Sequence, residues 1–218
     1  MSSNLIRWGG PALILGGLLW VLTYLVEIIF GMTAGEAAYN RADASASILV
    51  WFWGVFFMGA LFFLGVGLLG VRARLERRSK VLGTVGALLA LVAILAASIN
   101  LVTLTGVFGE PMANDGLGFL GVIGILGSSF LLGIAALRAK VLPRWARFVL
   151  TLTPFAFIPA IIVTIPLSSV APEYVVADFP FPVVGVVLGT VGYAVLNSRG
   201  DAKEKIKNRP LADDAVSP

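Results

Sequence analysis

The sequence contains no cysteine and no histidine. Without cysteine there are no disulfides, thiolate nucleophiles or cysteine-bound iron–sulfur clusters, and without histidine the usual zinc, copper and haem ligands are missing. Histidine is also the side chain that most readily transfers protons near neutral pH. Most membrane redox chemistry is therefore not expected of this chain.

Charged residues are scarce as well. They make up 13% of the 218 residues, against about 25% in an ordinary soluble domain. Hydrophobic residues make up 58%, and the mean hydropathy is +0.95. This composition predicts a membrane protein.

The apolar residues form six blocks of about the 20 residues that a helix needs to cross roughly 30 Å of hydrocarbon. A membrane β-barrel would need alternating strands instead of continuous apolar runs such as LGTVGALLALVAILAASINLV. The fold class predicted is all-α, a polytopic six-helix transmembrane bundle within residues 1–199. A polar tail, residues 200–218, is expected to be disordered. The expected spans are residues 8–30, 48–71, 81–108, 117–137, 145–167 and 179–196.

The basic residues predict the orientation, because lysine and arginine stay on the cytoplasmic side of membrane helices. The loops on the opposite side hold acids, and Arg41 is their only base. We therefore expect both termini in the cytoplasm and the chain in the cell (inner) membrane. The bases that flank the spans are Arg7; Arg72, Arg74, Arg77, Arg78 and Lys80; Arg138, Lys140, Arg144 and Arg147; and Arg199, Lys203, Lys205, Lys207 and Arg209.

The second of these clusters, RARLERRSK, has two interpretations. Its bases Arg72, Arg74, Arg77, Arg78 and Lys80 anchor the topology, and they are also numerous enough to contact an anionic lipid head group. No basic stripe with interleaved aromatic residues occurs, so membrane lipids and not nucleic acid are the expected partners.

Small and aromatic residues predict how the helices pack. Gly118, Gly121, Gly124 and Gly127 recur at three-residue intervals, and segment 81–108 is likewise rich in glycine and alanine. Small residues allow close helix contact, so we expect segments 81–108 and 117–137 at the centre, or in contact with a membrane-protein partner or a second copy. The aromatic-rich segment 48–71 is expected to face lipid, with Trp51 and Trp53 in the outer aromatic belt. Prolines are expected to kink the fifth span at Pro154, Pro159 and Pro166, and DFPFP is expected to start the sixth helix.

Recognisable catalytic motifs are absent. The chain has no phosphate-binding loop, no G-x-S-x-G elbow and no H-E-x-x-H. Glu27 is the only acid in any expected span, so no pair of carboxylates is expected within the membrane. We predict no catalytic residues, no metal and no cofactor.

Glu27 lies near the outer end of the first span, where a carboxylate costs far less than at the bilayer centre. Stepping back by three and four residues gives Tyr24, Thr23 and Trp20, so the polar residues share one side of the helix. That side is expected to face protein.

Other spans place polar residues at a similar depth, namely Asn100, Thr103 and Thr164. One interpretation is an outward-facing cavity that binds a small amphipathic molecule, with Glu27 as its anchor. The other is interhelical hydrogen bonding, worth about 0.6–2 kcal/mol for each bond. Arg41 is the one base expected to reach Glu27. The candidate ligand-binding residues are Glu27, Trp20, Thr23, Tyr24, Asn100, Thr103 and Thr164.

The leading functional hypothesis is binding or transport-like handling of a small apolar or amphipathic molecule or lipid at this cluster. The alternative is a structural or accessory subunit of a membrane complex with no ligand of its own. An intramembrane enzyme is the weakest hypothesis, because general acid–base chemistry would need partners for Glu27 that the sequence does not show.

Overall fold

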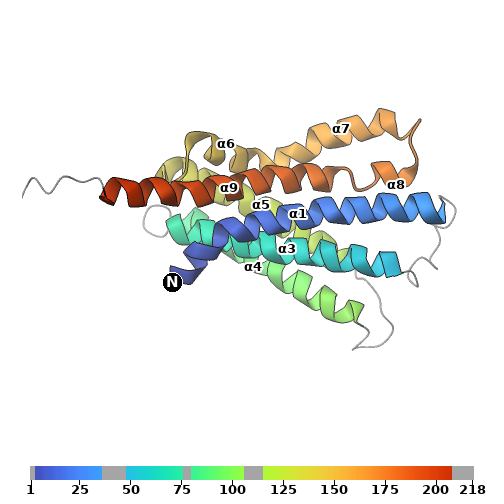
Figure 1. Cartoon of the computed structure of the whole chain (residues 1–218), viewed down its shortest axis with the longest axis horizontal. Coiled ribbons are helices and arrows are strands. Elements are labelled where there is room, and N and C mark those ends of the chain that lie inside the picture. Colours follow the sequence, from blue (N-terminus) through green and yellow to red (C-terminus); the bar gives the residue numbers. More distant parts are fainter. Residues whose placement is uncertain (1–2, 36–47, 76–79, 106–114, 208–218) are drawn as a thin grey trace, which may run out of the picture.

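The structure is a computed structural model that describes residues 3–35, 48–75, 80–105 and 115–207, and all the regular elements in these ranges are helical (Figure 1). Six helices or helix pairs are long and apolar enough to cross a membrane, which confirms the predicted six-helix chain. The elements are α1 (Ser3–Ala34), α3 (Ile48–Leu75), α4 (Lys80–Leu104), α5 (Asp115–Ala139), α6 (Arg144–Leu152), the 3-10 segment η2 (Thr153–Ala156), α7 (Phe157–Leu167), α8 (Glu173–Val176) and α9 (Pro180–Lys207).

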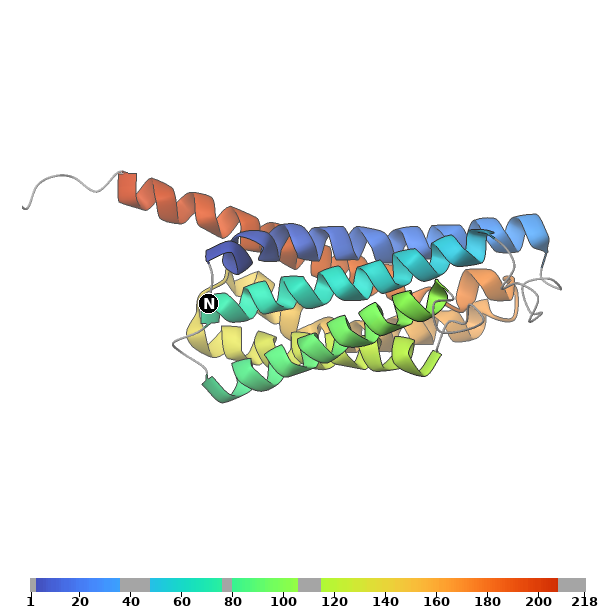
Figure 2. The same ribbon diagram turned by 90° about the horizontal axis from the view of Figure 1, so that it is seen from below.

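The helices form an elongated bundle in which α1 begins and α9 ends at the same end (Figures 1 and 2). We call this the basic end, because Arg7, Arg72 and Lys80 lie there. The opposite end, where α1 ends and α9 begins, carries Glu27 and Asp178 and is called the acidic end. The side of the membrane that each end faces stays a prediction.

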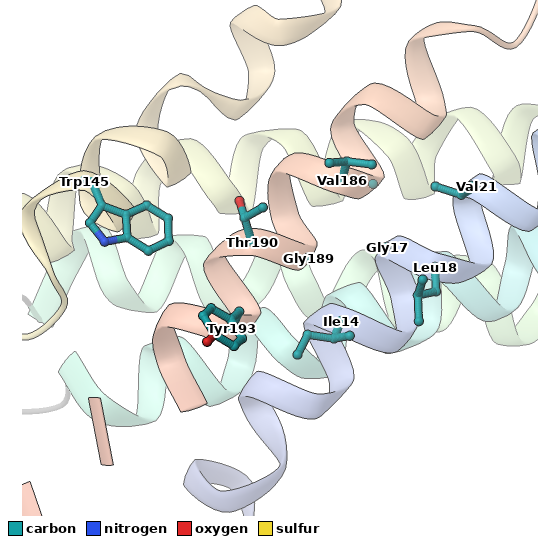
Figure 3. Close-up of a pocket in the computed structure, with 10 residues that line it drawn as sticks. Ile14, Gly17, Leu18, Val21, Trp145, Val186, Gly189, Thr190 and Tyr193 are labelled. Atoms are coloured by element: carbon teal, nitrogen blue, oxygen red, sulfur yellow. The ribbon is translucent and has the colours of Figure 1, made fainter. Parts of the chain in front are cut away.

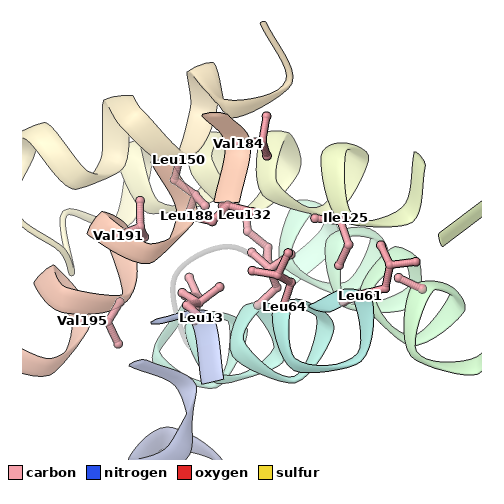
Figure 4. Packing of buried hydrophobic residues seen from close by; sticks show 14 of the residues in the cluster. Leu13, Leu61, Leu64, Ile125, Leu132, Leu150, Val184, Leu188, Val191 and Val195 are labelled. Carbon is pink, nitrogen blue, oxygen red and sulfur yellow. The ribbon is translucent and has the colours of Figure 1, made fainter. Parts of the chain in front are cut away.

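Helix α3 lies at the centre, which corrects the expectation that segment 48–71 faces lipid. Buried residues make up 61% of its most apolar stretch, against 33% for α4, and α3 packs against α1, α4 and α5. Leu61, Leu64 and Leu68 on α3 are fully buried. Trp51 does lie on the exposed face as expected. Figure 4 shows the core around α3, to which Leu13, Ile125, Leu132, Leu150, Val184, Leu188, Val191 and Val195 contribute.

The expectation that segment 81–108 is central is also wrong, because only 33% of the most apolar stretch of α4 is buried. A small-residue face specifies close contact with a neighbouring helix, not burial on every side. A Cβ added at Gly124 of α5 would lie 2.8 Å from the carbonyl oxygen of Leu89 on α4, so the backbones of these two helices approach closely there. The other side of α4 exposes large apolar residues, among them Leu88 and Leu95. Helix α5 is 56% buried over its most apolar stretch, as a central helix should be.

The fifth span is broken at Pro154, one of the three prolines expected to kink it, whereas α7 continues without a break through Pro159 and Pro166. Helix α6 ends at Leu152, Pro154 lies in η2, and α7 restarts at Phe157. Only 17% of this span is buried, and α7 makes its main contacts with α9 and η2. The sixth span starts at Pro180, as expected, but α9 continues to Lys207, into the segment expected to be a disordered tail. Residues 208–218 lie outside the described residues, and their disorder stays a prediction.

Candidate functional site

Two carboxyl groups meet at the acidic end. Glu27 on α1 is only 4% exposed, and its side chain is hydrogen-bonded to that of Asp178, in the turn that precedes α9. Trp53 on α3 donates its indole N–H to Oδ2 of Asp178 over 3.3 Å. A hydrogen bond between two carboxyl groups needs a proton on one of them, so the two side chains are placed to share a proton.

Asp178 and Trp53 are the site residues that sequence reasoning missed. Asp178 was expected in an outer loop, and Trp53 was expected to face lipid. A signal for Asp178 is that it begins DFPFP, two residues before a helix starts. Pro180 begins α9, and the amide of Phe181 donates to the carbonyl oxygen of Asp178 at 3.0 Å. The positive end of a helix dipole stabilises an acid at such a position.

The candidate residues on α1 other than Glu27 have partners of different kinds. Tyr24 donates its hydroxyl to the carbonyl oxygen of Val175 at 2.6 Å, which ties α1 to α8. Thr23 is buried and donates to the carbonyl oxygen of Leu19 in its own helix at 2.9 Å. Trp20 is fully buried, with its ring centroid 5.6 Å from that of Phe181.

Asn100 and Thr103 form a second polar group, on α4. Asn100 is 1% exposed, and Thr103 donates to its backbone oxygen at 2.8 Å and to its Oδ1 at 3.2 Å. A Cβ added at Gly118 of α5 would lie 3.9 Å from Nδ2 of Asn100. The missing side chain at Gly118 therefore leaves space beside the amide.

A cavity of about 400 Å³ connects the two polar groups, because both Asp178 and Asn100 line it. The rest of its wall is apolar and mostly aromatic. Phe119, which is 68% exposed, is part of that wall, so the cavity reaches the surface of the bundle. The lining residues are Trp53, Phe57, Met58, Asn100, Gly118, Phe119, Val122, Phe157, Asp178 and Phe181.

The aromatic rings of this wall pack against one another. The rings of Trp53 and Phe57 are stacked with centroids 5.3 Å apart. Phe181 meets Phe57 and Phe157 edge to face, at 5.3 Å and 5.6 Å. Such contacts hold rings in fixed positions, so the wall is preformed. Phe157 reaches the wall because the fifth span breaks just before it.

Thr164 has no contact with this group in the part of the chain that the structure describes, and Arg41 cannot be placed relative to it. Thr164 lies on α7 and donates to the carbonyl oxygen of Ile161 in its own helix at 2.7 Å. Arg41 lies outside the described residues, so its predicted contact with Glu27 stays a prediction.

A second, larger hollow runs between α1 and α9, with a volume of about 700 Å³ (Figure 3). A Cβ at Gly189 would meet no atom within 4 Å, so the missing side chain there leaves space open, whereas Gly17 and Gly185 are in contact, with a Cβ at Gly185 only 2.7 Å from the carbonyl oxygen of Gly17. Trp145, Thr190 and Tyr193 supply polar atoms toward one end of this groove, and none of the described residues that line it is charged. The groove lacks the carboxyl group and the cluster of aromatic side chains that distinguish the acidic-end cavity.

At the basic end, the expected lipid-binding bases have different environments. Arg74 donates to Oγ of Ser198 and to the carbonyl oxygen of Val195, both at 2.7 Å, and so joins α3 to α9. Arg72 packs over Gly83, and Lys80 is exposed. Arg77 and Arg78 lie outside the described residues. Contact of this cluster with anionic lipid stays a prediction.

Within the described ranges, no group of three or more acidic, histidine or cysteine residues is placed to hold a metal ion. Comparisons with protein-family models, with curated proteins and with solved structures find no match to this chain. The arrangement of the site is therefore the basis for any functional inference.

Proposed function

We propose that this multi-pass membrane protein binds a small amphipathic molecule in the acidic-end cavity, as a binding or transport-like protein. The observation that carries the proposal is the cavity itself, whose wall is aromatic and apolar except for Asp178 and Asn100. Ligand sites of small molecules have this composition, and their volumes are about 300–1,000 Å³.

The packing of α4 and α5 does not favour the alternative of an accessory subunit. That hypothesis needs the glycine-bearing faces to be open for a partner. Instead, α4 and α5 cover these faces for each other. A Cβ at Gly86 would lie 2.9 Å from Cγ of Leu132, and a Cβ at Gly124 would lie 2.8 Å from the carbonyl oxygen of Leu89. Contact with a membrane-protein partner or a second copy through these helices stays a prediction.

Filling the cavity tests the proposal. Gly118→Leu places a branched side chain beside Asn100, whereas Gly118→Ala adds only a Cβ whose nearest neighbour, Cε1 of Phe57, is 3.5 Å away. Each variant is purified in lipid nanodiscs, and retained small molecules are identified by native mass spectrometry. We expect the wild type and Gly118→Ala to retain a small amphipathic molecule and Gly118→Leu to lose it.

Gly189→Leu is the matched control, because it fills the α1–α9 groove instead. It should leave retention unchanged. Melting temperatures establish that all variants fold. Retention by a folded Gly118→Leu protein, or loss caused by Gly189→Leu, would contradict the proposed site.

A further inference from the structure

The charge of the cavity wall limits the ligands that it accepts. Among the described residues that line the cavity, Asp178 is the only one with an ionisable side chain. It is half-buried, hydrogen-bonded to Glu27 and to Trp53, and lies at the acidic end. An anionic ligand would be repelled here. A wholly apolar ligand would cover a carboxylate without offering it a partner, which is costly in an environment of low dielectric constant.

The aromatic residues favour a positive group in the same space. Trp53, Phe57, Phe157 and Phe181 all line the cavity. The face of an aromatic ring attracts a cation within about 6 Å, and tryptophan does so most strongly. Trp53 also donates a hydrogen bond to Asp178. The aromatic ring that best attracts a cation therefore lies beside the carboxyl group.

An inorganic cation does not suit this wall. Calcium and magnesium need about six or more oxygen ligands. The lining side chains offer the carboxyl group of Asp178 and the amide of Asn100, whose Oδ1 already accepts a hydrogen bond from Thr103. The remaining wall is hydrocarbon and aromatic, which suits the apolar groups of an organic cation.

We propose that the ligand of the acidic-end cavity is a monovalent organic ammonium compound, whose cationic group lies in the cavity next to Asp178 and the aromatic rings that line it. This inference rests on the proposed function, since it names the class of ligand for the same cavity. Asn100 contributes a polar atom on the α4 side, and the phenylalanine rings contact the apolar part of the ligand.

Two probes of nearly the same shape test the charge requirement. Benzyltrimethylammonium carries one positive charge, and neopentylbenzene has carbon in place of the nitrogen. Binding of each to the protein in nanodiscs is measured by calorimetry or tryptophan fluorescence, with empty nanodiscs as the control for partitioning into lipid. We expect the cation to bind about tenfold more tightly or better, as one added favourable charge interaction allows.

Asp178→Asn keeps the size of the side chain and an oxygen for the Trp53 indole. It should weaken binding of benzyltrimethylammonium about tenfold or more and leave neopentylbenzene unchanged. Glu173→Gln, an exposed acid at the same end, is the matched control and should change neither affinity. The comparison of probes on the wild type does not depend on the folding of any variant.

The outcomes separate the two proposals. If both probes bind equally and Gly118→Leu abolishes both, the cavity is a ligand site but the requirement for a cation is wrong. If Gly118→Leu changes neither affinity, the proposed site itself is wrong. If neither probe binds to the wild type, the ammonium inference is overturned.

Discussion

A buried carboxyl group needs a partner, because an isolated charge in an apolar interior is very costly. Glu27 satisfies this requirement through Asp178, a residue far away in the sequence, and Asp178 in turn accepts from Trp53. The three side chains come from α1, the turn before α9, and α3. The contact therefore joins three segments of the bundle at the acidic end.

Replacing Glu27 tests this contact at the scale of one residue. Glu27→Gln keeps a donor for Asp178 and should cost little stability. Glu27→Leu leaves the buried side of Asp178 without that hydrogen bond and should lower the free energy of unfolding by about 1–3 kcal/mol. Unfolding in mixed detergent measures both variants. Equal stability of the two would show that the hydrogen bond to Asp178 does not contribute.

Gly16 provides a second test at this scale. A Cβ at this position would lie 2.8 Å from the backbone nitrogen of Leu64. Helix α1 or α3 would have to shift to make room for it. Gly16→Ala should therefore destabilise the α1–α3 contact by about 1–3 kcal/mol, as overpacking does. Gly189→Ala is the control, because a Cβ there meets no atom within 4 Å. Similar stability of both variants would argue against the close α1–α3 packing.

Among the helices, the most informative is the broken fifth span. Segment η2, which contains Pro154, packs against both α5 and α9, and α7 restarts directly after it. Phe157, at the first position of α7, lines the cavity. The break therefore lies next to a residue of the cavity wall.

The hydrogen bonds between α3 and α9 at the basic end are also testable. Arg74→Gln shortens the side chain and removes its hydrogen bonds to Ser198 and Val195. Hydrogen bonds of charged groups contribute about 1.5–3 kcal/mol each, so the end of α9 should exchange its amide hydrogens faster. Hydrogen–deuterium exchange measures this. Arg138→Gln, an exposed arginine at the same end, should leave the exchange of α9 unchanged. Unchanged amide hydrogen exchange of α9 in Arg74→Gln would show that these hydrogen bonds do not hold α9 against α3.

The number and type of the helices could be predicted from the sequence, since length and hydropathy suffice to identify a span. The neighbours of each helix could not. Glycines indicated that α4 and α5 make close helix contacts, but not which helices they contact, and burial of α3 depends on which helices surround it. Glu27 and Asn100 were candidates from their polarity within apolar spans, whereas Asp178 became a site residue only through the position of α9 next to α1 and α3.

For the whole molecule, the charge distribution predicts the orientation in the membrane. Arg7, Arg72 and Lys80 lie at one end of the bundle, and by the positive-inside rule we expect that end to face the cytoplasm. The proposed ligand would then enter from the outer side, past Phe119 of the cavity wall.

The chain has no cysteine, so single cysteines can report this orientation without a background. Val170→Cys lies at the acidic end and Val81→Cys at the basic end, and both side chains are exposed. A membrane-impermeant maleimide added to intact cells should label Val170→Cys, and it should label Val81→Cys only after permeabilisation. The reverse pattern would place the cavity on the cytoplasmic side.

Photolabelling tests the central claim, the position of the ligand site, most directly. A phenyldiazirine that carries a trimethylammonium group is bound to the wild-type protein in nanodiscs, irradiated, and located by peptide mass spectrometry. We predict labels on Trp53, Phe57, Met58 or Phe181, and their loss in Gly118→Leu. Labels confined to the α1–α9 groove, at Trp145 or Tyr193, would contradict the account.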